Sequence, residues 1–556
     1  MSADQSFTTA RGARIQVVGP AELLTVERRE TIGRRFDQDP RIATVSLVAG
    51  GPKGFLQATA PAGSVVCVRT DHESLVGALD EDELDSWGET ARDRGLRHEW
   101  WITYAGDVTS ADSRDLADSD RTDSEHASSA HFQRTRVGSP EVLTLAIDAS
   151  WLGEHETGAQ VLTTSAVGAL AQHERVRAIS LRGVDSLPGY AEHLLDSPTV
   201  GMGGDNPADI CWFPNQIDFR SNFAQARSWG DRVITTYLDL IAYDIPRYHA
   251  SPQAWDSYRT LQRTTALASD GITTISADVS RRLLQEVPLL ESRRVQPISL
   301  GLDHVEESDV PADAPADIAS VARDLDARPF ILVLGNDFVH KNRDFAVRVW
   351  QELLRSGVAC DLVLAGLHVN SSSSRAGEEQ ALAAHVDLRG TVHTLGHVSS
   401  QSRAWLLAHA AAVLYPSSAE GFGFVPYEAA AVGTPSSFTL FGPLTELTGV
   451  TDAPHSWRVD EYVEDLRQLL SDEQEAKRRI RTLQHAIERR SWSDFADELV
   501  NFMFHISDLP IAPGRAVLAE VAQDSAELNA LLASKTWRMT APLRRAGKAL
   551  RGRPRH

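Results

Sequence analysis

Residues 417–428 read SSAEGFGFVPYE, and this stretch decides the fold. It follows an apolar run at 411–415 and precedes small residues at 429–432. An apolar run, a glycine-containing segment and a small-residue run predict a strand, a turn and a helix. Glycines let the backbone of such a turn approach a ligand closely, and free N–H groups at the start of the helix favour phosphate oxygens. We therefore predict a ligand-binding turn here.

Two glutamates frame this predicted turn. Glu420 lies in the turn, and Glu428 lies inside the predicted helix. Carboxylates accept hydrogen bonds, so two of them at different depths can hold two sets of sugar hydroxyls. The competing interpretation is a glycine-containing loop with surface glutamates, and the strand, loop and helix context makes it the weaker one.

An alternation of strand, loop and helix runs outward from this turn and occurs in two successive trains. Such trains indicate two parallel sheets, each covered by helices on both faces. Ligands bind beyond the C-terminal ends of such strands, which predicts a site in the cleft between the two halves. The strands are expected at 141–149, 176–181, 209–213, 232–237, 271–275 and 295–300 in the first train, and at 329–334, 359–365, 391–395 and 411–415 in the second.

The chain divides into five predicted segments. Acidic residues alternate with Ser and Thr in one linker, Pro, Asp and Ala fill a second linker at 304–328, and every charged residue from Lys535 onward is basic. The fold class is therefore α/β, with two Rossmann-like domains facing a cleft. The segments are an N-terminal α/β module (1–105), an acidic flexible linker (106–140), two Rossmann-like domains (141–315 and 316–508) and a basic C-terminal tail (509–556).

Composition excludes several classes of protein. The 556 residues carry a net charge of −21, which makes the chain a poor general nucleic-acid binder. Cys67, Cys211 and Cys360 lie too far apart for metal-ligand spacing or a disulfide framework, which suits a reducing cytosol. No apolar run reaches about 18 residues, and the N-terminus lacks a hydrophobic signal core, so we expect any membrane association to be peripheral.

Residues 141–508 resemble glycosyltransferase family 4, the retaining, nucleotide-sugar-dependent enzymes of GT-B fold. The family hallmark is a glutamate pair in a context like E-G-F-G-x-x-x-x-E, followed by small residues and G-T-P, and this chain has G-T-P at 433–435. The resemblance implies that Glu420 binds hydroxyls of the donor sugar and that Glu428 binds the ribose of the nucleotide. It also implies that the backbone of Gly421, Phe422, Gly423 and Phe424 lines the sugar and diphosphate.

A second motif, GNDFVHKN at 335–342, follows the first strand of the second train. Lys341 is a mobile point charge suited to a diphosphate. It matches the lysine of the family's G-x-x-x-x-(R/K)-K-(G/N) motif, which begins here at Gly335 and stabilises the leaving nucleoside diphosphate. Many relatives carry Arg before the lysine, whereas this chain has His340, which is largely neutral at neutral pH. A solvated lysine at a helix start is the alternative interpretation.

Three further segments resemble family loops. Residues 391–398, TVHTLGHV, are similar to a loop whose backbone contacts the nucleobase, which implicates Leu395, His397 and Val398; an ordinary strand end is the alternative. Residues 441–446, FGPLTE, resemble a loop with a closing glutamate, for which a surface role competes at Glu446. On the acceptor side, Gly158 opens a helix whose N-terminus could face the diphosphate.

The segment VITTYLDLI at 233–241 resembles the family's V-x-T-x-H-D-L-I. Leu238 stands where the family has histidine, and leucine cannot shuttle protons, so any role of that histidine is unnecessary or relocated, with Tyr237 as a candidate substitute. Asp239 remains, and we count it with Glu420 and Lys341 as the predicted catalytic residues.

The two ends of the chain carry their own resemblances. Residues 43–47, 75–77 and 87–98 are similar to the C-terminal half of a glycosyltransferase family 2 domain, with no nucleotide-binding first half before it, which suggests a scaffolding remnant. Residues 534–545 resemble a tail of bacterial surface-polysaccharide glycosyltransferases. A basic segment with apolar contacts can lie on an anionic membrane, near a lipid-linked acceptor; a disordered tail is the alternative.

The sequence thus predicts a retaining bacterial glycosyltransferase. It would move a mannose- or rhamnose-like hexose from a nucleoside-diphosphate sugar to a hydroxyl of a growing surface polysaccharide or lipid-linked glycan. We expect no metal, no nucleic-acid partner, and a cytoplasmic location, either free or peripheral at the inner face of the plasma membrane. The rival interpretations are a non-catalytic scaffold or regulatory subunit and a sugar-nucleotide epimerase of GT-B type.

Overall fold

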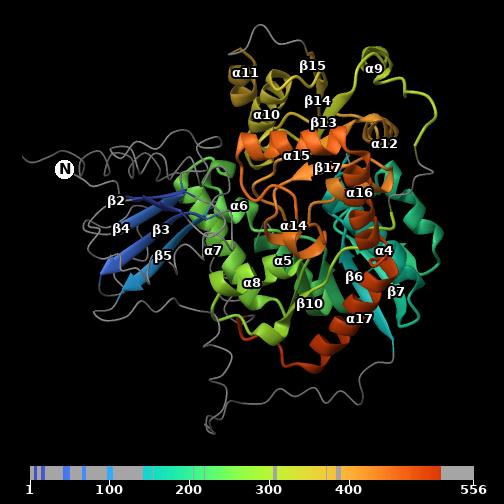
Figure 1. Cartoon of the computed structure of the whole chain (residues 1–556). Coiled ribbons are helices and arrows are strands. Elements are labelled where there is room, and N and C mark those ends of the chain that lie inside the picture. Colours follow the sequence, from blue (N-terminus) through green and yellow to red (C-terminus); the bar gives the residue numbers. More distant parts are fainter. Residues whose placement is uncertain are drawn as a thin grey trace, which may run out of the picture.

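The residues that the computed structural model describes form three β-sheets (Figure 1). It describes the backbone of five strands between residues 6 and 103, and then residues 142–514 except 155, 205, 218–219, 305–309, 371 and 384–389; side chains are described only in the second range, and there not for 220–222, 224 and 225. The predicted linker at 106–140 and the part of the predicted tail from 515 onward lie outside the described residues.

The N-terminal sheet has the strand order β1-β2-β4-β3-β5, in which β3 and β5 pair in parallel and the other pairs are antiparallel. Three of its strands coincide with short apolar runs, which are typical of strands. The strands are β1 (Ser6–Thr8), β2 (Arg14–Val18), β3 (Ile42–Ala49), β4 (Val65–Arg69) and β5 (Arg97–Thr103).

The second sheet is entirely parallel, in the order β12-β11-β10-β9-β6-β7-β8. The chain adds β7 and β8 on one side of β6 and then restarts on the other side with β9, so the topological switch point lies between β6 and β9. The elements are β6 (Leu143–Asp148), α4 (Gly158–Gln172), β7 (Val176–Arg182), η5 (Gly189–Asp196), β8 (Val200–Met202), β9 (Ala208–Phe213), α5 (Arg220–Trp229), β10 (Gly230–Tyr237), α6 (Ile241–Asp244), η6 (Pro246–Tyr248), α7 (Pro252–Ala268), β11 (Gly271–Thr274), α8 (Ala277–Glu286), η7 (Ser292–Arg294) and β12 (Val295–Pro297).

The third sheet is also parallel, in the order β15-β14-β13-β16-β17, with its switch point between β13 and β16. The prediction of two Rossmann-like α/β domains is therefore confirmed. The elements are α9 (Ala319–Leu325), β13 (Phe330–Leu334), η9 (Val339–Lys341), α10 (Arg343–Arg355), β14 (Asp361–Ala365), α11 (Arg375–Ala383), β15 (Val392–Leu395), α12 (Ser400–His409), β16 (Ala412–Tyr415), α13 (Val425–Ala431), β17 (Ser436–Phe438), α14 (Gly442–Leu447), α15 (Val459–Ser471), α16 (Glu473–Ile487) and α17 (Trp492–Asp508).

The last described helix, α17, returns to the first domain and lies beside α4 (Figure 1). The predicted second domain at 316–508 includes this helix, which contacts α4, β10 and β11 of the first domain. The helix buries an apolar stripe that includes Phe495, Leu499 and Phe502. It packs so closely on β11 that a Cβ at Gly271 would lie 2.7 Å from Ile506 Cγ1.

The chain crosses between the two domains at two neighbouring points. The N–H of Leu302 donates to the carbonyl of Arg490 at 2.9 Å, and the N–H of Trp492 donates to Asp303 Oδ1 at 2.9 Å. The predicted linker at 304–328 is partly helical, since it contains α9. This helix buries Ala322 and Leu325. Among the described residues, no helix is long and apolar enough to cross a membrane.

Candidate functional site at the domain junction

The predicted glycine turn leads from β16 into α13, as its pattern indicates. Gly423 has φ +88°, a conformation that favours glycine, and Leu444 packs against it so that a Cβ would lie 2.9 Å from Leu444 Cδ2. Helix α13 begins at Val425 with Pro426 in its first turn, where the missing N–H of proline is tolerated. The turn therefore lies at the C-terminal edge of the third sheet, beside the switch point.

The half-buried Lys341 and the buried Glu420 form an ion pair at this edge. Lys341 Nζ lies 2.6 Å from Glu420 Oε1, and the Tyr415 hydroxyl donates to the same oxygen at 2.5 Å. Burial alone would raise the pKa of Glu420, but the Lys341 ammonium and the hydrogen bond from Tyr415 hold it below its ordinary value. The predicted sugar-binding carboxylate is thus charged and oriented, and Tyr415 is a partner that the sequence motifs did not indicate.

Local backbone geometry brings Lys341 to Glu420. Asn342 adopts the left-handed conformation with φ +51°, and its Nδ2 donates to the carbonyl of Pro416 at 2.9 Å. This bond ties the end of β13 to the end of β16. Gly335, at φ +135°, faces the side chain of Lys341, with its would-be Cβ 3.9 Å from Lys341 Cε.

Glu428 is buried on α13 and pairs with Arg403 of α12. Sequence reasoning missed Arg403, whose only signal is its position shortly after the predicted nucleobase loop. The charge of the predicted ribose-binding carboxylate is therefore balanced within the protein. Arg403 also acts on Glu156 of the first domain, whose pKa is raised by burial and partly lowered again by this guanidinium.

The first domain meets the glycine turn in direct contact. A Cβ on Gly421 would lie only 1.8 Å from the carbonyl oxygen of Leu238, so only glycine fits here. A Cβ on Gly158, at the start of α4, would lie 3.5 Å from the ring of Phe424. The segments around Gly158 and Leu238 thus contact the glycine turn directly, at the place where the sequence predicts a cleft.

Gln216 holds the backbone at Leu238 and was also missed by sequence reasoning. Its Oε1 accepts from the N–H of Leu238 at 3.2 Å, and its Nε2 donates to the carbonyl of Asp239 at 2.7 Å. Asp239 itself accepts from the N–H of Ile241 at 2.8 Å, and burial raises its pKa. Tyr237 does not replace the absent histidine, because its buried hydroxyl donates to the carbonyl of Gln262 at 2.7 Å inside the first domain.

Glu446 joins the two domains. Its two carboxylate oxygens accept from the N–H groups of Ala277 at 2.8 Å and Asp278 at 2.9 Å, in the first turn of α8. A carboxylate at a helix N-terminus satisfies amides that have no partner within the helix. Glu446 is thus an exposed residue, as the surface interpretation has it, but its carboxylate is bound to the start of α8.

The predicted nucleobase loop lies at the C-terminal end of β15, the edge strand of the same sheet. Leu395 and Val398 are half-buried and His397 is exposed. The carbonyls of Leu395 and Gly396 accept from the N–H of Gly366 at 3.3 and 3.1 Å, which anchors the loop to the end of β14. The structure therefore places these residues on the correct edge but does not bring them into contact with Glu420 or Lys341.

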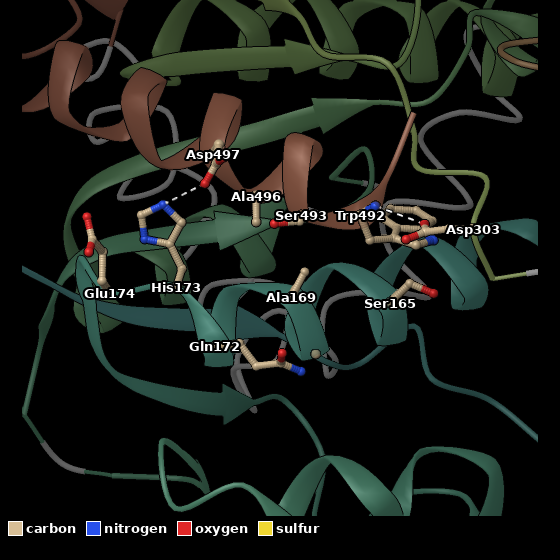
Figure 2. A pocket seen from close by; sticks show the side chains of 11 residues that line it. Ser165, Ala169, Gln172, His173, Glu174, Asp303, Trp492, Ser493, Ala496 and Asp497 are labelled. Carbon is tan, nitrogen blue, oxygen red and sulfur yellow. Dashed lines mark hydrogen bonds and ion pairs between the residues drawn. The ribbon is translucent and has the colours of Figure 1, made fainter. Parts of the chain in front are cut away.

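A groove of about 710 Å³ lies elsewhere, between α4 and α17 (Figure 2). Small residues such as Gly168 and Ala496 leave it open, and His173 Nε2 pairs with Asp497 Oδ1 at 3.1 Å on one wall. None of the predicted site residues lines it. Within the described residues, no group of three or more His, Cys, Asp or Glu side chains is arranged to hold a metal ion.

The fold and this junction define a two-domain α/β protein with a charged site at the switch point of its second domain. Residues 319–485 match the family model described as "Glycosyl transferases group 1". A search of curated protein sequences gave no significant match.

The chain is also similar to several solved structures. HepE of Anabaena, solved with UDP and glucose, is 16% identical with a TM-score of 0.47, covering 65% of this chain and 98% of its own. Sucrose-phosphate synthase of Thermosynechococcus elongatus is 16% identical with a TM-score of 0.47, covering 64% and 97%. The UDP-forming trehalose-phosphate synthase of Burkholderia xenovorans, solved with glucose-6-phosphate, is 12% identical with a TM-score of 0.49, covering 65% and 100%.

Proposed function

We propose that this protein is a retaining hexosyltransferase that uses a nucleoside-diphosphate sugar. The observation that carries the proposal is the Lys341–Glu420–Tyr415 cluster, which lies at the switch point within the matched glycosyltransferase domain. Cleavage of the donor's glycosidic C–O bond develops positive charge on the anomeric carbon and negative charge on the diphosphate. A preorganised cation and fixed dipoles lower that barrier, because they are already aimed at the developing charge.

Each predicted residue has a role in this scheme. Lys341 stabilises the departing diphosphate, while Glu420 binds hydroxyls of the sugar beside it. Glu428 exchanges its bond with Arg403 for bonds to the ribose hydroxyls. The backbone of the glycine turn lines the sugar and diphosphate, and Asp239 holds the facing loop of the first domain.

The mechanism needs neither a protein nucleophile nor a metal. In the front-face route of retaining enzymes, an oxygen of the leaving diphosphate assists removal of the acceptor hydroxyl's proton. This route makes the leucine at position 238 tolerable, because no side chain there has to carry a proton. Lys341 supplies the positive charge that a metal would otherwise bring.

The acceptor and location follow from the resemblance to bacterial surface-polysaccharide enzymes. We propose a mannose- or rhamnose-like hexose as the transferred group and a growing polysaccharide or lipid-linked glycan as the acceptor. The basic segment from Lys535 onward supports a position at the cytoplasmic face of an anionic membrane, because basic residues are attracted to such a surface.

The test is donor turnover by the full chain. A thermal-shift panel of nucleotide sugars first identifies the donor, since a ligand at 100 times its Kd stabilises a protein by about 2.7 kcal/mol. We then expect Lys341→Met and Glu420→Gln each to lower turnover at least about 100-fold, equivalent to about 2.7 kcal/mol of transition-state stabilisation. Lys477→Met, which removes an exposed lysine paired with Glu473 on α16, is the matched control.

Three outcomes contradict the proposal. Full activity in both variants would show that the Lys341–Glu420–Tyr415 cluster takes no part in the reaction. Absence of turnover by the parent protein with every donor and glycan acceptor would favour the scaffold. Formation of an epimerised sugar nucleotide without acceptor would favour the epimerase.

A further inference from the structure

Tyr248 of the first domain crosses the junction and contacts the loop that carries Lys341. Its hydroxyl is hydrogen-bonded to His340 Nδ1, and its ring stacks on Phe338 with a centroid distance of 5.4 Å. The neighbouring carbonyl of Arg247 accepts from Ser372 Oγ in the second domain. The turn η6 is therefore seated on the second domain by both side-chain and backbone bonds.

Both partners of the Tyr248–His340 bond are uncharged. Burial raises the pKa of Tyr248, so its phenol keeps its hydrogen and has one to donate. His340 is also buried, and its imidazole is uncharged because burial, and then the adjacent Lys341, lower its pKa to about 3. A neutral phenol can donate or accept, so this bond is compatible with either tautomer; when Nδ1 accepts from Tyr248, the hydrogen of the neutral imidazole lies on Nε2.

His340 is also connected to the turn that carries Glu420. Its carbonyl accepts from the N–H of Ser418 at 2.8 Å. The next residue, Lys341, is paired with Glu420. The charged groups that face His340 and Tyr248 are Lys341, Glu420 and Asp239. The imidazole thus lies among the predicted diphosphate- and sugar-binding groups, and it occupies the position where many relatives carry arginine.

We propose that Tyr248 is a positioning residue that fixes His340 as its Nε2–H tautomer, and that this uncharged N–H donates to the donor's diphosphate beside the Lys341 ammonium. The inference rests on the proposed function and deepens it. Because Tyr248 belongs to the first domain, the diphosphate-binding group is complete only when the two domains meet. Closure and diphosphate recognition are thereby linked by a single hydrogen bond.

The decisive experiment is a double-mutant cycle on nucleotide binding by the full chain. The probe is whichever of UDP, GDP and dTDP binds the parent most tightly, compared with the corresponding monophosphate. We expect Tyr248→Phe to weaken diphosphate binding about tenfold, equivalent to about 1.4 kcal/mol, and to change monophosphate binding less than about twofold. In a His340→Arg background, the charged guanidinium needs no tautomer, so Tyr248→Phe should have almost no effect.

Tyr243→Phe is the matched control, since it removes a hydroxyl that donates to Glu286 at 3.0 Å within the first domain. His340→Gln is the second variant, to be used if Tyr248→Phe lowers folding stability. Its side-chain amide keeps an N–H donor at position 340. A direct readout is the 15N signal of His340, assigned by its loss in His340→Gln, which should report a protonated Nε2 in the parent.

Equal losses of diphosphate and monophosphate affinity in Tyr248→Phe would reduce Tyr248 to a structural contact and overturn the proposal. The same holds if Tyr248→Phe has the same effect in the His340→Arg background, or if Nδ1 carries the hydrogen. A parent protein that binds no nucleoside diphosphate would instead contradict the proposed function itself, so the two failures are distinguishable.

Discussion

The first domain meets the C-terminal half of the chain at two interfaces that differ in kind. Against α17 the contact is apolar and closely packed, with Phe495, Leu499 and Met503 fully or almost fully buried. At the junction of the two domains the contacts described above are largely polar: the carbonyl of Leu238 against Gly421, the amides of α8 on Glu446, and the phenol of Tyr248 on His340.

The difference separates a permanent interface from one that can open. Burial of apolar area contributes about 25 cal/mol per Å² and is lost when surfaces separate. Hydrogen bonds at a polar contact are exchanged for bonds to water, at a net cost of only about 0.5–1.5 kcal/mol each. We therefore infer that α17 stays attached to the first domain while the polar junction opens to admit ligands.

The largest effect is expected on folding stability, when the apolar interface of α17 is altered. Leu499→Ala leaves a cavity in the α17 interface and should lower the free energy of unfolding by about 2–5 kcal/mol, measured by chemical denaturation. Turnover per folded molecule should change little. Ser493→Ala, at an exposed position of the same helix, is the control. A loss of turnover without a loss of stability would contradict the structural role of α17.

The second prediction concerns closure. In Gly421→Ala, the added Cβ meets the carbonyl oxygen of Leu238 at a distance no real contact tolerates, so the domains cannot approach. We expect kcat/KM to fall about 100-fold, while the melting temperature changes little, since the open form relieves the clash. Gly189→Ala, with no atom near its would-be Cβ, is the control. Normal turnover by Gly421→Ala would show that this contact is not formed during the reaction.

A smaller effect is expected at the bridging glutamate. Glu446→Ala removes both bonds to the first turn of α8, so the closed arrangement is favoured less. We expect kcat/KM to fall about tenfold and the radius of gyration of the nucleotide-bound protein, from small-angle scattering, to increase. The control is Glu488→Ala, at an exposed glutamate that pairs with His485 of α16. An unchanged radius of gyration in Glu446→Ala would show that Glu446 does not stabilise the closed arrangement.

The smallest effect near neutral pH is at His340. Its pKa is about 3 in the folded protein and 6.5 ordinarily, so between these values the unfolded chain binds a proton that the folded protein does not. This residue therefore makes the folded state less stable as the pH falls below 6.5. His340→Gln should reduce the slope of unfolding free energy against pH by up to about 1.4 kcal/mol per unit over about pH 4–6.

This slope is measured by denaturation at a series of pH values. His485→Gln, at an exposed histidine of α16, is the control. Identical slopes in the parent and His340→Gln would mean that the imidazole is hydrated and titrates normally in the folded protein.

The regular elements of the two domains were predictable because buried parallel strands are continuous apolar runs. The run at 411–415 corresponds to β16, and that at 329–334 corresponds to β13. Two strands were missed, β8 and β17. Each has only three residues, and β17 reads Ser-Ser-Phe, so neither produces an apolar run long enough to recognise.

Within the site, residues that belong to local motifs were predictable and their partners were not. The pattern around Glu420 and Lys341 is visible in the sequence, but their meeting depends on β13 and β16 being neighbours in the sheet. Tyr415, Arg403 and Tyr248 contact the site only through tertiary structure. The return of α17 to the first domain is non-local in the same way, since its apolar stripe does not specify which sheet it will cover.

The paired crossings at Leu302 and Arg490 have a consequence for the architecture. Because the chain leaves the first domain and re-enters it at hydrogen-bonded neighbours, the second domain is in effect an insertion whose two ends touch. A unit attached in this way can be excised and its flanks rejoined by a very short peptide, or exchanged for the equivalent unit of another protein. The unit to which we assign donor binding can therefore be exchanged as a whole, while the remainder of the molecule keeps its own covalent path.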